Sequence, residues 1–282
     1  MDNSLLAVRG INHKYIVVAK DETVMILKVE NLTFGYHNEI PLFRNVNFSL
    51  KKGEIFSILG ANGAGKSTMM NCIANLLEPH GGAIYLKGQK MSEMPLKKVA
   101  QCIGYVPQIH MPAYGYEVRD FVVMGRAPYI GMFSHPSASD YQLADEILED
   151  FGISRLAHRP YIELSGGERQ QVTIARAIVQ QPDIILLDEP TNHLDYGNQL
   201  RMIHLIKRLS SKGYGIIITS HIPDHVLLLD GRVGLLGADG SLMTGTTDEI
   251  LTEENLKNLY HVDVHMVYVE EVKRKVCISG GH

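Results

Sequence analysis

Apolar and polar positions along this chain follow two different periods, and the change from one to the other marks the predicted elements. Residues 26–60 alternate with a period of two or are continuously apolar, which predicts strands joined by turns such as 51–54. Further strands are predicted at 83–87 and 103–106. Helical and strand patterns then alternate at 167–180, 183–187, 198–209 and 214–219. Strands and helices in alternation are typical of a parallel α/β sheet.

The segment between the strands that end at 106 and the alternating elements that begin at 167 has a mainly helical pattern. Residues 109–163 hold helical patterns at 118–124 and 141–151, with a connection rich in proline, serine and glycine around 128–139. The sequence therefore predicts a helical subdomain at about 109–168, inserted into the α/β domain.

The N-terminal residues are predicted to stand apart from the main domain. Residues 1–24 precede the first strand pattern and are expected to be a dispensable extension, so that Met25 is a candidate alternative start. The alternative is that 15–19 adds an edge strand to the fold.

The C-terminal part returns to short elements. Helical patterns are expected near 248–251 and 253–260, and residues 260–269 alternate like a strand. The main domain is therefore expected to cover 25–270, and 271–282 are expected to form a C-terminal tail.

A glycine-rich motif follows one of the predicted strands. The apolar run 54–59 predicts a buried strand, and 69–77 predicts a helix. Between them stands the pattern G-x-x-x-x-G-K-[ST] of a phosphate-binding P-loop. Its residues are Gly60, Ala61, Asn62, Gly63, Ala64, Gly65, Lys66, Ser67 and Thr68.

A strand, a glycine loop and a helix N-terminus together form an anion site, because backbone N–H groups and the helix dipole point at the phosphates. Gly63 and Gly65 allow backbone angles and close approaches that a Cβ would block. Lys66 can reach the terminal phosphates, and the Ser67 hydroxyl can ligate Mg²⁺. A P-loop alone fits kinases, GTPases, helicases and transport ATPases alike.

A pair of acidic residues ends a second apolar strand. The run 184–187 is followed by Asp188 and Glu189, and ligands bind at this edge of open α/β sheets. Asp188 is predicted to hold Mg²⁺, and Glu189 is predicted to polarise the attacking water as a general base.

A third motif consists of Leu164, Ser165, Gly166, Gly167 and Glu168. Alone, its serine and glycines would be an ordinary helix cap. Together with the other two motifs, it makes the chain resemble the ATP-binding cassette (ABC) ATPases, whose signature is Leu-Ser-Gly-Gly-Gln/Glu.

The resemblance, which covers about 26–270, implies roles for further residues. Tyr36 matches the aromatic residue that stacks on adenine. Gln108 matches the glutamine that contacts Mg²⁺ and senses the membrane partner. Asp195 matches the loop that crosses to the opposite subunit, and His221 matches the histidine that holds the γ-phosphate.

Two departures from the family pattern concern these same loops. Asn-His-Leu precedes Asp195 where Ser-Ala-Leu is frequent, and Ile222 and Pro223 follow His221 where an acidic residue is common. Proline lacks a backbone donor, so the loop geometry there is in question, but the role of His221 is not.

The resemblance also implies a fold and a mechanism. The fold is α/β, of the P-loop NTPase (ABC ATPase) type, with a RecA-like core, an antiparallel β subdomain and an inserted helical subdomain. Two copies are expected to form a head-to-tail homodimer, in which ATP and Mg²⁺ on the P-loop of one copy are covered by 165–167 of the other. Hydrolysis through Glu189 would reopen the pair.

Composition and charge indicate which classes of partner to expect. The chain has 282 residues, of which 45% are hydrophobic and 21% charged, as in a folded protein. A net charge of −4 and a pI near 6.3 show no basic excess, so no nucleic-acid partner is expected. No apolar run reaches membrane-spanning length, so any membrane role is expected to come through a partner.

Cysteine and histidine usage argues against a metal centre or a disulfide framework. Cys72, Cys102 and Cys277 are odd in number and far apart, which favours a reducing cytoplasm. His261 and His265 lie in the strand-like stretch, which favours an exposed strand face over a metal site.

Three classes of ABC ATPase compete: the subunit of an importer, the subunit of an exporter, and a soluble ATPase of translation or DNA maintenance. The soluble class generally has two fused cassettes or a long inserted coiled coil, and this chain has neither. Residues 117–128 and 251–256 resemble importers for iron-siderophores, haem, cobalamin, and molybdate or tungstate.

The importer hypothesis implies particular partners and a cellular location. The partners are integral membrane permease subunits and, indirectly, an extracytoplasmic solute-binding protein, and the location is peripheral at the cytoplasmic face of the cell membrane. Met124, Tyr129 and Phe133 either line the groove for a permease helix or pack the core of the helical subdomain. The sequence leaves the cargo open.

Overall fold

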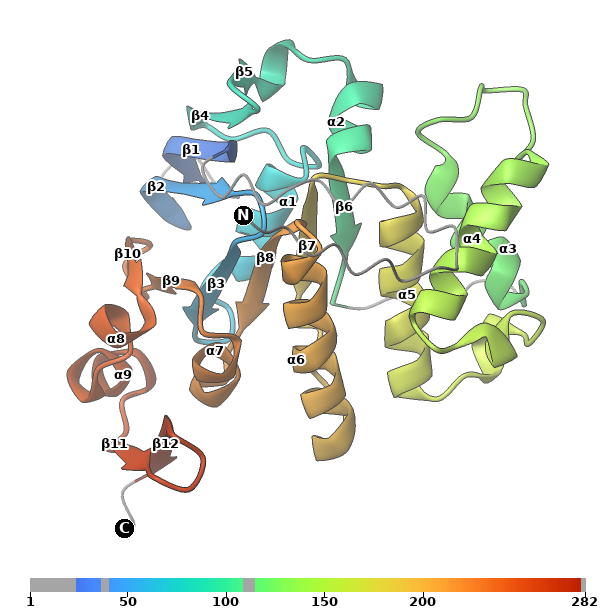
Figure 1. Cartoon of the computed structure of the whole chain (residues 1–282). Helices are drawn as coiled ribbons and strands as arrows, with labels where there is room; N and C mark the ends of the chain where they lie inside the picture. The colour runs from blue at the N-terminus through green and yellow to red at the C-terminus, as the bar shows by residue number, and fades with distance from the viewer. Residues whose placement is uncertain (1–23, 37–40, 109–114, 280–282) are drawn as a thin grey trace, which may run out of the picture.

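The computed structural model describes residues 24–36, 41–108 and 115–279, and a mixed sheet forms the centre of this part of the chain (Figure 1). Its strand order is β10-β9-β3-β8-β7-β6, with parallel neighbours from β9 to β6 and an antiparallel β10 at the edge. The strands are β3 (Ile55–Gly60), β6 (Ile103–Val106), β7 (Ile184–Asp188), β8 (Gly215–Ser220), β9 (Arg232–Leu236) and β10 (Leu242–Thr246). β3, β7 and β8 are buried along their whole length, as expected for parallel strands covered on both faces.

Helices cover this sheet and supply its core with apolar stripes. They are α1 (Lys66–Ile73), α2 (Leu96–Cys102), α5 (Gly166–Val179), α6 (Tyr196–Ser211) and α7 (Pro223–Leu229). On α6 the buried side chains recur at helical spacing, namely Met202, Ile203, Leu205, Ile206 and Leu209. The predicted parallel α/β sheet is therefore confirmed. The helix predicted at 69–77 begins earlier, at Lys66, because the P-loop turns directly into it.

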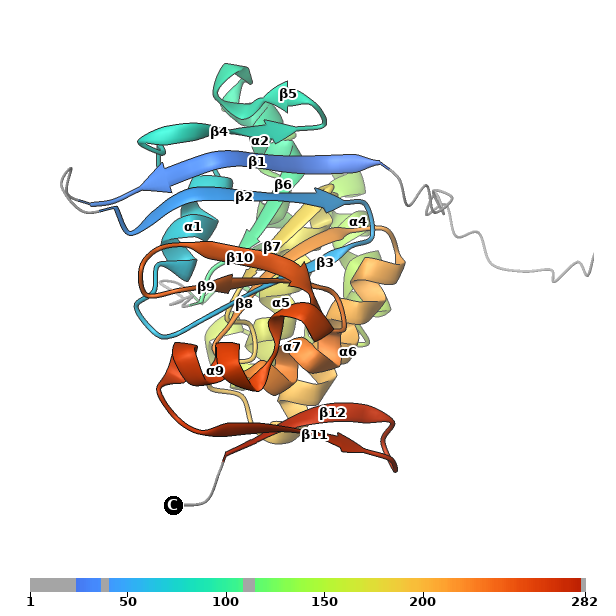
Figure 2. The ribbon, with the colours of Figure 1, turned by 90° about the vertical axis from the view of Figure 1, so that its left-hand side faces the viewer.

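A second sheet is antiparallel, as the family resemblance implied, and has the order β2-β1-β4-β5. Its strands are β1 (Met25–Phe34), β2 (Phe43–Lys51), β4 (Gly81–Leu86) and β5 (Gln89–Lys90), and the short helix η1 (Met91–Glu93) follows β5. Figure 2 shows this sheet lying over α1. The predicted N-terminal extension and the alternative edge strand at 15–19 fall outside the described residues, except for Val24.

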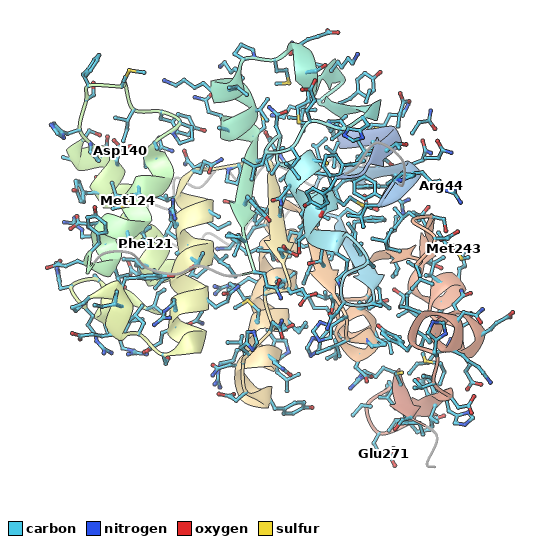
Figure 3. The ribbon with its side chains drawn as sticks, turned by 180° about the vertical axis from the view of Figure 1, so that it is seen from behind. Arg44, Phe121, Met124, Asp140, Met243 and Glu271 are labelled. Carbon is cyan, nitrogen blue, oxygen red and sulfur yellow. The ribbon has the colours of Figure 1, made fainter. Side chains whose placement is uncertain are left out.

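The helical subdomain lies beyond α5 (Figure 1). It contains α3 (Val118–Val123), η2 (Met124–Arg126), α4 (Ala138–Asp150), η3 (Ser154–Leu156) and η4 (Tyr161–Glu163). The α4 helix begins three residues before the predicted 141–151, because Ser137 and Asp140 form a capping box at its start. Figure 3 shows Phe121, Met124 and Asp140 together on this side of the molecule.

The three apolar residues considered for a permease groove separate in the structure. Met124 is partly buried and packs against the core, as the core-packing alternative proposed. Phe133 is 95% exposed and Tyr129 is 40% exposed, with the Arg126 guanidinium 4.0 Å above the Tyr129 ring. Only Tyr129 and Phe133 therefore remain available at the surface.

The C-terminal part consists of α8 (Thr247–Ile250), α9 (Glu253–Tyr260) and a hairpin of β11 (Val264–Val269) and β12 (Arg274–Ser279). The strand predicted from residue 260 was wrong at its start, because α9 runs to Tyr260 and His261 ends it in the left-handed conformation. His265 does lie on an exposed strand position. The boundary expected after residue 270 falls inside the hairpin.

Candidate functional site

Four neighbouring strands deliver the predicted site residues to one edge of the sheet. β3, β8, β7 and β6 run parallel, so their carboxyl ends lie side by side. The P-loop follows β3, and His221 follows β8. Asp188 ends β7, Glu189 comes directly after it, and Gln108 comes two residues after β6. Residues that are far apart in the sequence thus meet because of the strand order.

The P-loop backbone depends on glycine. Gly63 and Gly65 have φ angles of +81° and +99°, and a Cβ on Gly65 would lie 2.8 Å from Cγ of Leu42. Gly65 is also the N-cap of α1 and offers no side chain to the first-turn N–H groups. These N–H groups therefore have no side-chain cap, which leaves them available to an anion as the motif predicts.

The Lys66 ammonium is almost fully buried beside the same loop. Its Nζ donates to the carbonyl oxygens of Gly60, at 2.9 Å, and Ala61, at 3.0 Å. It also lies 3.2 Å from Oε1 of Glu189. All three ammonium donors thus have partners, and a phosphate group bound at the loop would compete for them.

The Glu189 carboxylate is where most of the site converges. Its Oε2 accepts from Nε2 of Gln108, at 3.1 Å, and from Nδ2 of Asn192, at 3.0 Å. The residue adopts a φ of +46°, which is rare outside glycine and turns the chain sharply after β7. Such backbone strain clusters at functional sites.

A threonine that sequence reasoning missed holds both acidic residues. The Thr219 hydroxyl donates to Oδ1 of buried Asp188, at 2.6 Å, and accepts from the backbone N–H of Glu189, at 2.9 Å. Asp188 and Thr219 are partners in the β7–β8 register. The sequence signal that could have identified Thr219 was a polar residue near the end of an otherwise apolar strand.

Burial, and then the charge of Asp188, raise the pKa of the neighbouring Tyr105.

His221 points its ring at the same carboxylate. Its buried Nδ1 lies 3.2 Å from Oε2 of Glu189 but makes no hydrogen bond within the described part of the chain. A buried polar atom without a hydrogen-bond partner is uncommon, and a catalytic role is one explanation for it. Pro223 is the first residue of α7, where no N–H bond is needed, so it leaves the geometry at His221 intact.

Tyr36 lies beside the P-loop, as the family resemblance implied. Its ring is 65% exposed, its hydroxyl is 3.1 Å from the Thr68 hydroxyl, and Phe34 supports it edge-on at a centroid distance of 5.3 Å. An exposed aromatic ring next to a phosphate loop is suited to stacking on a base.

The signature residues and Asp195 are brought together with each other, but not with the P-loop. Ser165 caps α5 through Glu168, and Asp195 caps α6 by accepting from the N–H of Asn198 at 2.8 Å. A Cβ on Gly167 would lie 2.7 Å from Oδ1 of Asn198, so the two helix starts are in contact. Figure 1 shows α5 next to the helical subdomain and apart from α1.

The donor set at the edge fits a magnesium ion. Ser67, Asp188 and Gln108 provide a hydroxyl, a carboxylate and an amide oxygen, which are ligands that Mg²⁺ accepts. Among residues 24–36, 41–108 and 115–279, no three His, Cys, Asp or Glu side chains cluster as metal ligands. Mg²⁺ does not require such a cluster when phosphates and water complete its shell.

The same described ranges include no helix with the length and apolarity to span a bilayer.

Comparison with known proteins agrees with this geometry. The ABC transporter family matches residues 43–192. The molybdate import ATP-binding protein MolC of Haemophilus influenzae is 39% identical over 237 residues, which are 84% of this chain and 88% of that protein. The iron(3+)-hydroxamate import ATP-binding protein FhuC of Bacillus subtilis is 32% identical over 254 residues, which are 90% of this chain and 94% of that protein.

Solved structures give the same result. An inward-facing conformation of a metal-chelate type ABC transporter superposes with a TM-score of 0.81 at 35% identity, covering 91% of this chain and 98% of that one. An ATP-binding cassette of an ABC transporter in its ADP conformation superposes with a TM-score of 0.76 at 25% identity, covering 85% and 99%. The match thus extends over the antiparallel, central and helical parts together, and the chain belongs to the ABC transporter family as one of its ATP-binding proteins.

Proposed function

We propose that this chain is the ATPase subunit of an ABC importer, and that two copies of it hydrolyse ATP with Mg²⁺ at their shared interface. The proposal depends on one observation: Lys66, Gln108, Asn192 and His221 all approach the Glu189 carboxylate. A carboxylate held in this way at the end of β7 is placed to accept a proton from water.

Each site residue has a separate role in the proposed hydrolysis. The P-loop N–H groups and Lys66 bind the phosphates, and Tyr36 stacks on the base. Glu189 accepts the proton of the attacking water, and the imidazole of His221, whose Nδ1 faces Glu189 without a hydrogen bond, contacts the γ-phosphate. Mg²⁺ would be held by Ser67, Asp188 and Gln108, and it would neutralise the charge that develops on the phosphates.

The position of the signature supports the proposed dimer. Residues 164–168 lie at the start of α5, apart from α1 in the same chain (Figure 1), which suits them to the nucleotide of a second copy. Asp195 lies on the same face through the Gly167–Asn198 contact. ATP between two helix N-termini joins the copies, and loss of the γ-phosphate releases them.

The cargo and partners are proposed from the relatives. MolC imports molybdate and FhuC imports iron(3+)-hydroxamate, according to their names, so the cargo is a metal chelate (iron-siderophore, haem or cobalamin) or an oxyanion such as molybdate or tungstate. The chain then works at the cytoplasmic face of the membrane, bound to permease subunits that receive cargo from an extracytoplasmic binding protein. The exposed Tyr129 and Phe133 are available for the permease contact.

Reconstitution tests this proposal. The chain is purified with a candidate importer permease from the same genome, placed in proteoliposomes with a candidate binding protein, and given ATP. We expect ATP-dependent uptake of a ferric siderophore or of molybdate, and no uptake with Lys66→Ala. Movement of cargo in the opposite direction, or ATPase activity with no permease association, would reject the importer assignment.

A further inference from the structure

The C-terminal part of the chain makes a direct contact with the site. The Tyr260 hydroxyl donates a hydrogen bond of 2.8 Å to the backbone carbonyl oxygen of His221. Tyr260 is the last residue of α9, which lies between the β11–β12 hairpin and the central sheet (Figure 2). Thirty-nine residues separate the two partners in sequence, so only the tertiary fold brings them together.

This contact is one of two hydrogen bonds that hold the peptide unit between His221 and Ile222. The carbonyl of His221 accepts from Tyr260, and the N–H of Ile222, in the same peptide unit, donates to Oγ of Ser220 at 3.0 Å. Both polar ends of this peptide are therefore bonded. Since the orientation of this planar unit restrains ψ of His221, it also restrains the backbone position from which the imidazole projects.

A second tether joins the same two parts of the chain. The backbone N–H of Cys277 on β12 donates to Oδ1 of Asp224, at 3.1 Å, and the Arg274 guanidinium lies 3.8 Å from that oxygen. Asp224 is in the first turn of α7, three residues after His221. The hairpin and α9 thus hold the chain at the histidine itself and three residues after it.

Tyr260 is itself well fixed. Thr252 caps α9, and neighbouring Leu256 is fully buried in the cluster against which Tyr260 packs. Burial raises the pKa of Tyr260, so its hydroxyl remains a donor at all physiological pH values.

We propose that Tyr260 is a positioning residue for ATP hydrolysis: its hydrogen bond to the His221 carbonyl holds the imidazole against the γ-phosphate. The proposal rests on the function proposed above for His221. It predicts an effect confined to the triphosphate state, because ADP has no γ-phosphate for His221 to contact.

The variant Tyr260→Phe tests this, since it removes the hydroxyl and keeps the ring. We expect kcat, and the affinity for a non-hydrolysable ATP analogue, each to fall about five-fold, as for loss of one hydrogen bond. The affinity for ADP should stay close to wild type, and the melting temperature should fall by no more than about 4 °C. The matched control is Tyr141→Phe, whose hydroxyl donates to Asp120 at 3.2 Å in the helical subdomain. It should lower the melting temperature by a similar amount and leave kcat and both nucleotide affinities unchanged.

A double variant separates positioning from general stabilisation. In the His221→Ala background, Tyr260→Phe should cause no further loss of analogue affinity, because the group it positions is gone. An equal loss in that background, or a parallel loss of ADP affinity, would show a merely structural role and overturn the proposal. If His221→Ala alone leaves analogue affinity and turnover intact, the function proposed for His221 fails as well. If only Tyr260→Phe is without effect, the inference fails alone.

Discussion

Lys66 and Glu189 form a buried ion pair across the edge of the central sheet. Nζ and Oε1 are 3.2 Å apart, and the two side chains are 4% and 8% exposed. Lys66 begins α1 after the loop that follows β3, Glu189 directly follows β7, and β8 lies between these two strands. Because bound phosphates would compete with Glu189 for the ammonium, we expect binding of the triphosphate to free the proposed base. This one contact would then couple nucleotide binding to activation of the carboxylate.

Removing the ammonium should abolish the activity. We expect Lys66→Ala to lower ATP turnover by at least about a hundred-fold, because a charged group that stabilises the transferring phosphoryl is lost. Phosphate release by the purified protein measures this. Exposed Lys97→Ala is the control and should behave as wild type. Turnover at an undiminished rate in Lys66→Ala would refute the site assignment.

Glu189→Gln should separate binding from hydrolysis. The amide retains the shape of the side chain but cannot take the proton of the attacking water, so turnover should fall about 10²- to 10⁴-fold. ATP binding should persist, and light scattering should detect dimers that form on ATP addition and are absent with ADP. Exposed Glu93→Gln provides a comparison with unchanged turnover. Persistent Glu189→Gln monomers at high ATP would contradict the sandwich.

Two P-loop glycines should differ in their tolerance of alanine. Both have positive φ angles, but only at Gly65 would the added Cβ collide, at 2.8 Å from Cγ of Leu42, whereas Gly63 faces open space. We expect Gly65→Ala to destabilise the protein by about 2 kcal/mol more than Gly63→Ala. Urea unfolding measures the difference. Adding Leu42→Ala should shrink the excess cost of Gly65→Ala, and no shrinkage would argue against the collision.

The start of α4 should give the helical subdomain an acid-sensitive component of stability. Hydrogen bonds from Ser137, and then from Arg126, lower the pKa of Asp140 to about 2. A depressed carboxyl pKa stabilises the fold above the unfolded pKa, and this contribution is lost as pH falls from about 4 to about 2. We expect Asp140→Asn to cost about 1 kcal/mol at pH 7, and less as the pH approaches 2. Urea unfolding at a series of pH values checks this, and a cost independent of pH would contradict it.

The sequence predicted the residues proposed for binding and catalysis better than the residues that hold them in position. The P-loop, Asp188 and Glu189 each follow an apolar strand, and that local signal is sufficient to place a group at a sheet edge. Thr219 was missed because its role depends on pairing with Asp188 across two strands that are distant in sequence. Asn192 was missed as a partner of Glu189 because it acts through the turn that the +46° φ angle creates.

Element boundaries failed where a tertiary contact or a cap overrides the local pattern. The strand pattern at 260–269 begins only at Val264, because the end of α9 is fixed by packing of Leu256 and by the Tyr260 hydrogen bond. Likewise, the α4 start depends on the Ser137 cap, which lies in a stretch that looked like an irregular connection.

The trans arrangement of the signature can be tested by mixing two inactive variants. Lys66→Ala removes the phosphate cradle and retains the signature, whereas Ser165→Arg blocks the signature and retains the cradle. In a mixed dimer, the cradle of the Ser165→Arg copy faces the intact signature of its partner. We therefore expect the mixture to regain a substantial part of wild-type phosphate release, although each variant alone is inactive.

A second mixture supplies the control, because its two lesions fall on the same half of the site. Lys66→Ala mixed with Glu189→Gln leaves every cradle paired with a defect in its own copy, so no activity should return. If the first mixture also stays inactive while light scattering shows mixed dimers, the signature does not act on the nucleotide of the partner copy. Equal recovery in both mixtures would instead mean that the lesions do not divide between the two halves as the separation of α5 from α1 requires.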